Sequence, residues 1–231
     1  MNNNPFNSDS FKKIWLKYFN NSRAGESFSF IRGISFVKHK FLPIFVNVGD
    51  NLTDGLTYEF DTNNFKDYKG KVFLVRDIPT YHSLKPSNNG GTLKLKKVFQ
   101  YEGYTTEISN YENLDQYMRS IFKSNSRYKF RRNMERLESC FDIKYTMYHG
   151  EISSEEFKHV FDTFYNLLEK RYTNKQERCG ELDPELWSYY FELAYTMINE
   201  KSASLFVIYD NNTPIGITFN YHFGSIFIEA L

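Results

Sequence analysis

The sequence predicts an α+β protein, in which helices and sheet-forming segments occupy separate blocks of a 231-residue chain. Aromatic residues make up 19% of the chain, and they favour strands and dominate cores, although a low-GC genome would enrich the same residue types. Several segments repeat apolar residues at helical spacing. Near the end, three apolar runs are separated by short polar turns, which favour antiparallel neighbouring strands.

Composition and charge exclude several classes of protein. Hydrophobic residues at 41% and charged residues at 25% are ordinary for a folded chain and exclude extensive disorder. The net charge of +1 gives no general attraction for nucleic acid or an anionic membrane. The sequence shows no export signal and no run of about 20 apolar residues. Its two cysteines lack metal or disulfide spacing. We therefore predict a soluble, cytoplasmic protein without a membrane span.

The first block, to about residue 110, is predicted to be a sheet with one leading helix. Apolar residues at helical spacing predict that helix over 9–19, with Ser8 or Asp9 as its cap. Strands are expected over four apolar or alternating segments, which are 27–38 with an interruption at Gly33, 41–48, 71–76 as a buried strand, and 92–101. Glycine, asparagine and proline predict loops over 49–55 and 79–91.

The second block combines helices with an antiparallel sheet. Two helices are expected over 114–123 and 127–138, followed by a strand over 141–148. Two amphipathic helices follow, and their starts are marked by the capping box Ser153–Glu156 and by Asp183 before Pro184. Three antiparallel strands are expected over 203–209, 215–221 and 226–231. Because the last strand is apolar and no turn follows it, we expect the natural polypeptide to continue beyond Leu231.

The strongest electrostatic feature is the segment 119–136, which carries seven basic residues and one acid. In a helix over 127–138, Phe130, Met134 and Leu137 are predicted to form a buried stripe. Lys129, Arg132 and Arg136 fall on the opposite, solvated side. Arg127 and Arg131 lie at the rim of the stripe, where a fixed guanidinium suits phosphate or carboxylate recognition. The alternative is that Arg131 pairs with Glu135 one turn later.

Two stretches carry a family resemblance. Within 106–138, a helix leads into a second helix marked by Ser126, Arg127, Arg131, Arg132, Arg136 and Leu137. Residues 204–219 combine a strand, a polar turn, Pro-Ile-Gly and a second strand. Together with the order of strand, two helices and antiparallel strands, these stretches resemble CelD-like and FemAB-like proteins of the GNAT acyltransferase superfamily. The resemblance covers about residues 105–231.

The resemblance implies a tandem GNAT-like architecture with a first domain over 1–110, a basic helical linker over 111–140 and an incomplete second domain over 141–231. It also implies an N-acyltransferase that moves an acyl or aminoacyl group from a donor such as acetyl-CoA to an amine, in a cell-envelope precursor, a lipid or a similar polar metabolite. In this family a Gly-rich turn after the fourth strand holds the acyl-CoA pyrophosphate. That turn would lie beyond Leu231, so the chain alone is expected to be inactive.

Six residues are candidates for the site. Glu229 and Tyr221 lie in the closing strands, where a carboxylate or phenol can act as general base, although a lone strand glutamate is more often simply outward-facing. Arg127 and Arg131 are candidates for an anionic substrate. Asn51 and Asp54 of the 49–55 loop would form a polar rim with Asn47 and Thr53, unless these side chains satisfy their own backbone.

The other chemistry that the sequence allows is limited. Its five histidines are scattered, so no metal site and no Ser-His-Asp set is predicted, and no Walker A or dinucleotide fingerprint is present. A different class of function remains open, in which the chain is a non-catalytic binding module. It would use the basic helix pair within 119–136 to contact an anionic partner such as RNA.

Overall fold

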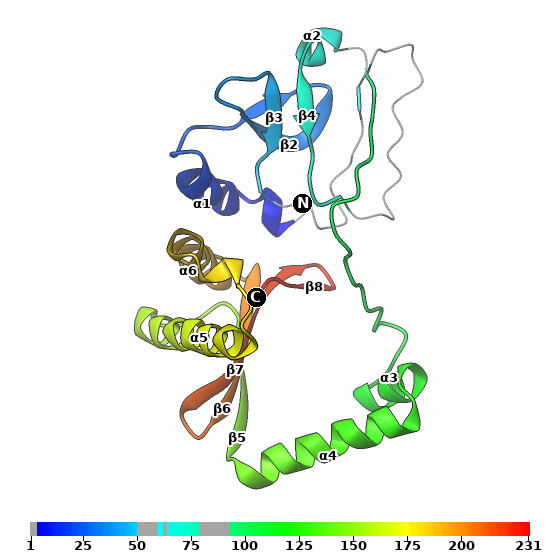
Figure 1. Cartoon of the computed structure of the whole chain (residues 1–231), viewed down its shortest axis with the longest axis vertical. Helices are drawn as coiled ribbons and strands as arrows, with labels where there is room; N and C mark the ends of the chain where they lie inside the picture. Colours follow the sequence, from blue (N-terminus) through cyan, green and yellow to red (C-terminus); the bar gives the residue numbers. More distant parts are fainter. Residues whose placement is uncertain (1–3, 50–59, 62–63, 79–92) are drawn as a thin grey trace.

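The computed structural model describes residues 4–49, 60–61, 64–78 and 93–231. Over these residues the chain contains two four-stranded sheets, one mixed and one antiparallel, together with helices. The predicted α+β fold class is thereby confirmed. Figure 1 shows the two sheets in different parts of the molecule, with an extended segment leading from the first block to the helices that precede the second sheet.

The first sheet is built from short strands in sequence order. Its members are β1 (Glu26–Phe28), β2 (Ile31–Lys38), β3 (Ile44–Asn47) and β4 (Val72–Leu74). The first three strands are antiparallel, and β4 lies parallel to β3. β2 continues through Gly33, so the interruption predicted there is wrong, and the chain turns instead at residues 29–30. A short helix, α2 (Phe65–Tyr68), leads into β4 without a clear signal in the sequence.

Two other strand predictions in this block need correction. β4 is an edge strand rather than a buried one, because Val72 is 57% exposed and only Phe73 of this strand packs on the core. The stretch predicted over 92–101 has no strand among its described residues 93–101. Side chains hold it instead, since Gln100 Nε2 and the Tyr101 hydroxyl donate to Asp77 Oδ1 at 2.8 and 2.6 Å. Alternation alone does not provide the partner strand that a ladder needs.

A pair of helices separates the two sheets. These are α3 (Leu114–Ile121) and α4 (Ser124–Cys140), so the break between them falls at residues 122–123 rather than at the predicted 124–126. Neither helix contains a buried residue. The prediction that the apolar stripe of α4 is buried is therefore wrong, since Phe130 is 46% exposed. Figure 1 shows α4 running from α3 toward the start of the second sheet.

The second sheet is an antiparallel meander after one crossover. Its strands lie in the order β5 (Ile143–Tyr148), β6 (Ala203–Asp210), β7 (Thr213–Phe223) and β8 (Ile226–Glu229). The antiparallel pairing of the three closing strands confirms the prediction from their short turns. Their register places Ser204 opposite Asn220, and Asn220 opposite Glu229.

Two capped helices connect β5 to β6. The first, α5 (Ser154–Lys175), begins at Ser153, whose hydroxyl accepts from the Glu156 N–H at 3.1 Å. The Glu156 carboxylate does not return this bond but accepts from the Tyr148 hydroxyl at 2.6 Å. A short 3₁₀ helix, η2 (Gly180–Leu182), follows. The next helix, α6 (Pro184–Asn199), has Asp183 as its N-cap, as predicted. Asp183 Oδ1 accepts from the N–H groups of Glu185 and Leu186.

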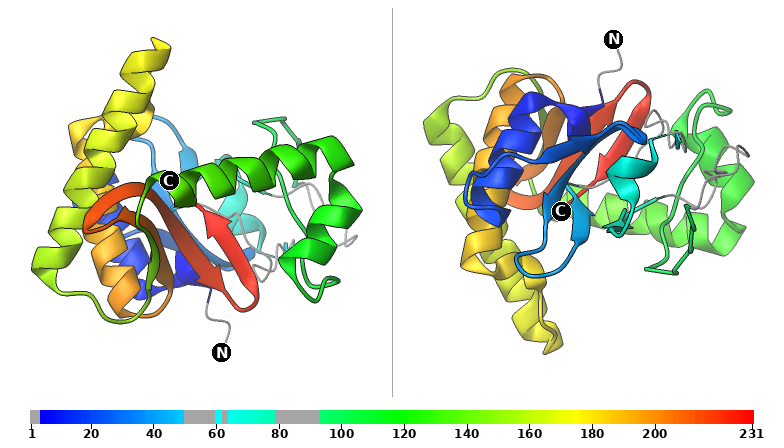
Figure 2. Two further views of the ribbon diagram at one scale, coloured as in Figure 1. Left: turned by 90° about the horizontal axis from the view of Figure 1, so that it is seen from below. Right: turned by 90° about the horizontal axis from the view of Figure 1, so that it is seen from above.

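The main hydrophobic core lies between the second sheet and the helices on one of its faces. α5 and α6 supply much of it, but so does the amino-terminal segment, which consists of η1 (Pro5–Asn7) and α1 (Asp9–Phe19). Phe6 and Phe11 are buried against Tyr221, with ring centroids 4.7 and 6.4 Å from it. Figure 2 shows α1 beside α6. The leading helix, which the sequence groups with the first sheet, thus packs on the second.

Candidate functional site

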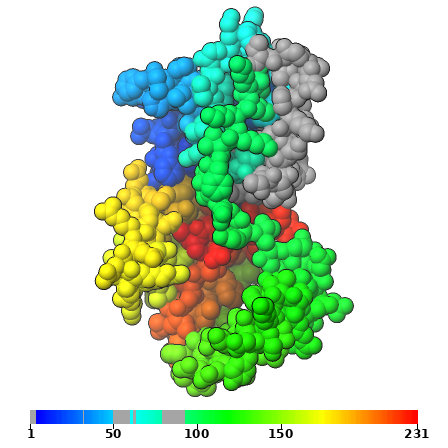
Figure 3. All heavy atoms as spheres, turned by 45° about the vertical axis from the view of Figure 1, so that its right-hand side comes forward, coloured from blue at the N-terminus to red at the C-terminus, as the bar shows by residue number. Residues whose placement is uncertain are grey.

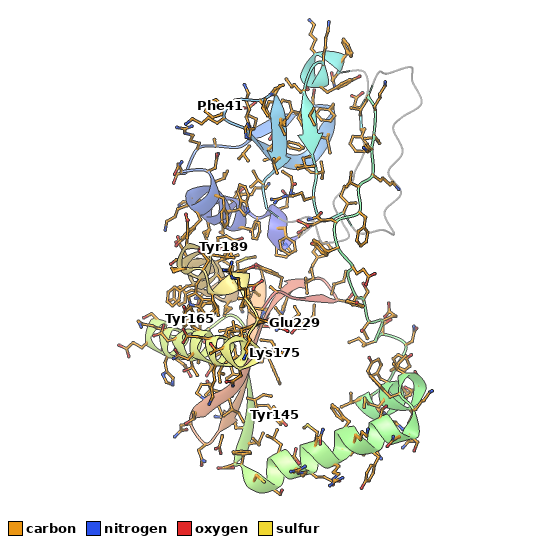
Figure 4. The ribbon with its side chains drawn as sticks, viewed as in Figure 1. Phe41, Tyr145, Tyr165, Lys175, Tyr189 and Glu229 are labelled. Carbon is orange, nitrogen blue, oxygen red and sulfur yellow. The ribbon has the colours of Figure 1, made fainter. Side chains whose placement is uncertain are left out.

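The second sheet has one covered face and one open face. Alternation along the strands directs Ala203, Leu205 and Val207 toward the helices, where all three are buried. The opposite set of side chains, which we call the open face, comprises Ile143, Tyr145, Met147, Ser204, Phe206, Ile208, Asp210, Thr218, Asn220, His222, Phe227 and Glu229. Figure 3 shows strand surface, in orange and red, between the yellow helices and the green 93–140 segment. Figure 4 labels Tyr145 and Glu229, which mark two edges of this sheet.

A compact polar cluster occupies one end of the open face. His222 Nε2 lies 2.7 Å from Ser204 Oγ, across the β6–β7 pair. The His149 ring stacks on that of His222, with centroids 4.6 Å apart and planes inclined by 19°. On β8, Phe227 contacts the same imidazole at a centroid distance of 4.3 Å. His222 is therefore held in position by a hydrogen bond and two ring contacts.

The surroundings of His222 favour its neutral form. Burial lowers the pKa of His222 from its ordinary value, and the neighbouring His149 lowers it further. His149 Nδ1 lies 3.1 Å from the carbonyl oxygen of Ala203, and because a carbonyl only accepts, this nitrogen carries a hydrogen. A histidine whose pKa is lowered in this way is neutral near pH 7 and has one ring nitrogen free to accept a proton.

Ser204 positions the imidazole. The distance from Ser204 to His222 is one that a nucleophilic serine and its base would also have. However, Ser204 is only 1% exposed, even though its side of the sheet is open. A substrate carbonyl cannot reach a hydroxyl that is buried beneath its neighbours. The chemistry available at this cluster is thus proton transfer by His222, with Ser204 as the positioning residue.

The structure separates the two residues predicted as general base. Glu229 is exposed on the open face, in the row that also contains Asn220. Tyr221 pairs with Ile228 and points to the opposite face, where it is 4% exposed among the rings of Phe6 and Phe11. The two side chains therefore cannot act on one substrate. Glu229 shares a face with the His222 cluster, whereas Tyr221 belongs to the core.

The two rim arginines of α4 are both engaged with α3 or its end. Arg131 Nη2 lies 3.1 Å from Asp115 Oδ1, so the alternative pairing with Glu135 is not the one that forms. Arg127 Nη1 donates to the Phe122 carbonyl oxygen at 2.5 Å. These contacts fix both guanidinium groups on the helix pair. Their role toward an anionic substrate stays a prediction.

The loop candidates Asn51 and Asp54 lie outside the described residues. Just before them, Asn47 is buried at the end of β3. Its side-chain nitrogen donates to the Gly49 carbonyl oxygen, and its Oδ1 accepts from the Arg76 N–H at 2.9 Å. The Asn47 side chain thus forms hydrogen bonds with backbone groups. This is the alternative to a role in substrate binding that the sequence left open for the polar rim.

The open face does not fit the nucleotide part of an acyl-CoA. Binding of its phosphates requires a helix N-terminus, a cluster of backbone N–H groups or cationic side chains. Among the described residues, the strand positions of the open face include no lysine or arginine, and their formal charges are those of two acids, Asp210 and Glu229. α5 and α6 pack on the other face. What this face does fit is a cationic or hydrogen-bonding group.

Comparisons of the chain with protein-family models, with curated protein sequences and with solved structures found no match. Separately, no helix in the described part of the chain combines the length and the apolar character needed to cross a membrane. The fold and the side-chain geometry are therefore the basis for any statement about function.

Sequence reasoning missed the central residue of the cluster. His149, Ser204 and His222 are far apart in the sequence and follow no spacing motif. The short turn predicted between the strands over 203–209 and 215–221 does not reveal the pair either, because the register shifts by one residue between Ile208 and Tyr209. Only after this shift does Ser204 fall opposite Asn220 and beside His222, which shares its face. The stacking of His149 depends on where β5 pairs and could not be found in this way.

Proposed function

We propose that the second sheet is the acceptor-binding part of an N-acyltransferase. The observation that carries this proposal is the neutral imidazole of His222, positioned by buried Ser204 on the open face. Amide formation needs an unprotonated amine, and a positioned base near neutral pH supplies it. The order of strand, two helices and three antiparallel strands supports the proposal through the resemblance to GNAT acyltransferases.

The described residues account for the amine side of the reaction. Glu229 attracts the ammonium form of the acceptor, and Asn220 provides a hydrogen-bonding neighbour in the same row. With Nε2–H of His222 donating to Ser204 Oγ, the lone pair on Nδ1 accepts one proton from the ammonium. The free amine then attacks the acyl carbonyl carbon. The new C–N bond replaces the bond to the leaving group, which departs with the second amine proton, and His222 releases its proton to solvent.

A nucleotide-free donor gives the most direct test. The whole chain is incubated with S-acetyl-N-acetylcysteamine, a small thioester, and with ethanolamine, lysine or glucosamine, and release of free thiol is followed. We expect amine-dependent release that falls about a hundredfold in His222→Asn, which is at the low end of the effect of losing a general base.

The matched control is His159→Asn, which removes an exposed imidazole from α5 on the covered side of the sheet. This variant should release thiol at the wild-type rate. Equal rates in wild type and His222→Asn, or no amine-dependent release with any of the three amines, would contradict the proposal. His159 is exposed and His222 is half-exposed, and circular dichroism of each variant checks that it is folded.

A further inference from the structure

The helix pair α3–α4 exposes apolar side chains that a folded protein normally covers. None of its residues is buried, and Phe130 is 46% exposed on α4. On α3, Leu114 and Ile121 are 64% and 56% exposed. Helices that expose this much apolar surface usually bind something with it. Figure 3 shows the pair, in green, forming the lower part of the molecular surface.

The charge on α4 is arranged around its apolar stripe. With about 100° per residue, Met134 and Leu137 lie within about 40° of Phe130. Arg131 is about 100° away on one side, and Lys129 and Arg136 are about 100° and 120° away on the other. Unpaired cations thus border the stripe on the side of Lys129 and Arg136, whereas on the other side Arg131 pairs with Asp115 and Glu138 lies about 80° from Phe130. Among the described residues Lys129, Arg132 and Arg136 make no ion pair, so their charges are not neutralised.

This arrangement matches a helix that lies in the interface of an anionic membrane. Such helices insert an apolar stripe while the flanking lysine and arginine side chains reach the lipid headgroups. Single-stranded RNA would instead need a platform of aromatic rings. The two rings of α4 do not form one, because Tyr128 lies about 160° around the helix from Phe130.

We propose that α3–α4 docks on an anionic membrane surface, with the Phe130 stripe of α4 inserted between headgroups. This interaction is peripheral and requires no membrane-crossing helix. It goes beyond the proposed acyl transfer and does not depend on it. Its consequence is that the open face of the second sheet would be held close to a lipid surface, where amine-bearing headgroups are concentrated.

Vesicle co-sedimentation of the whole chain tests the proposal. Vesicles of pure phosphatidylcholine are compared with vesicles of equal parts phosphatidylcholine and phosphatidylserine. We expect the protein to sediment with the anionic vesicles, to remain in solution with the neutral ones, and to dissociate as salt is raised. Equal binding to both kinds of vesicle, or no binding to either, would overturn the proposal. Binding of a single-stranded RNA oligonucleotide without binding to anionic vesicles would overturn it in favour of a nucleic-acid partner.

Variants of α4 test the apolar stripe and the charges beside it separately from the effect of net charge on vesicle binding. Lys129→Gln with Arg136→Gln should weaken binding about fivefold for each charge removed. Phe130→Ser should weaken binding at every salt concentration. The matched control, Lys40→Gln with Lys170→Gln, removes the same charge from exposed positions outside the helix pair and should bind as wild type does. If the control loses as much binding as the α4 variant, the interaction reflects net charge and the proposed surface is wrong.

Discussion

Gly49 is the residue at which backbone and packing requirements coincide. Its φ of +72° is a conformation that L residues rarely adopt, and a Cβ there would clash with the ring of fully buried Phe11. Gly70 has a similar φ of +68°, but a Cβ at that position would meet no described atom within 4 Å. Replacing each of these glycines by alanine therefore separates the conformational cost of the substitution from its steric cost.

Gly49→Ala should lower the free energy of unfolding by about 2–4 kcal/mol, since the left-handed conformation and an overpacked ring both contribute. Gly70→Ala should lower it by about 1 kcal/mol, from the conformational cost alone. Urea denaturation of both variants measures the difference. Equal losses would show that the Phe11 ring moves aside at no cost.

His222 should make stability depend on pH. Its pKa is lowered in the folded protein, so the unfolded chain binds more protons between the folded value and the ordinary value of about 6.5. The free energy of unfolding should therefore decrease as pH falls through about 6.5 and level off below the folded pKa. In His222→Asn this decrease should be smaller. Denaturant titrations at several pH values check it, and an unchanged slope would contradict the assigned burial of the ring.

At the scale of elements, the cap of α6 is the simplest to test. Asp183 Oδ1 accepts two backbone N–H groups at the start of a helix that contributes Leu193, Ala194 and Met197 to the core. Asp183→Ala should lower the free energy of unfolding by about 1 kcal/mol, because both donors lose their acceptor. Asp183→Asn keeps a carbonyl oxygen in place and should cost only a few tenths of that, about 0.3 kcal/mol. Thermal or urea unfolding distinguishes the two variants.

Elements with local signals were predictable from the sequence. The caps at Ser8, Ser153 and Asp183 mark helix starts that the structure confirms, and the short turns predicted the antiparallel pairing of the closing strands. The stretch 92–101 alternates in the same way but has no partner strand among the described residues. The apolar stripe of α4 was likewise predicted to be buried and is not. Periodicity shows which residues share one face of a helix, but it does not show whether another element covers that face.

The candidate site was less predictable than the elements that carry it. Glu229 was found as a polar residue in a strand, and its position on the open face follows from the register. The environment of His222 depends on residues from three separate segments, so composition and spacing give no indication of it. Tyr221 does lie in a predicted strand, β7, but its side chain is on the covered face, where the amino-terminal segment packs over it.

At the scale of the whole molecule, the amino-terminal segment stabilises the second sheet. Phe11→Ala should lower the free energy of unfolding by about 3–5 kcal/mol, as for a fully buried phenylalanine. Phe19→Ala, on the same helix but 42% exposed, should cost about 1 kcal/mol. Hydrogen exchange should show the larger loss of protection in β7, which carries Tyr221. If Phe11→Ala deprotects only the first sheet, the packing of α1 on the second sheet is wrong.

The open face connects these scales, because four strands place its residues, the amino-terminal segment with α5 and α6 covers the opposite side, and a neutral imidazole defines the chemistry. The measurement that tests this most directly is the titration of His222 by NMR, with ¹³C-labelled histidine and His222→Asn to assign the signal. We predict a pKa below the ordinary histidine value, which moves back toward it in His149→Asn because a neighbouring charge is removed. A pKa at the ordinary value would contradict the burial assigned to the ring, and a pKa raised above neutral pH would leave His222 protonated and contradict its role as the proton acceptor.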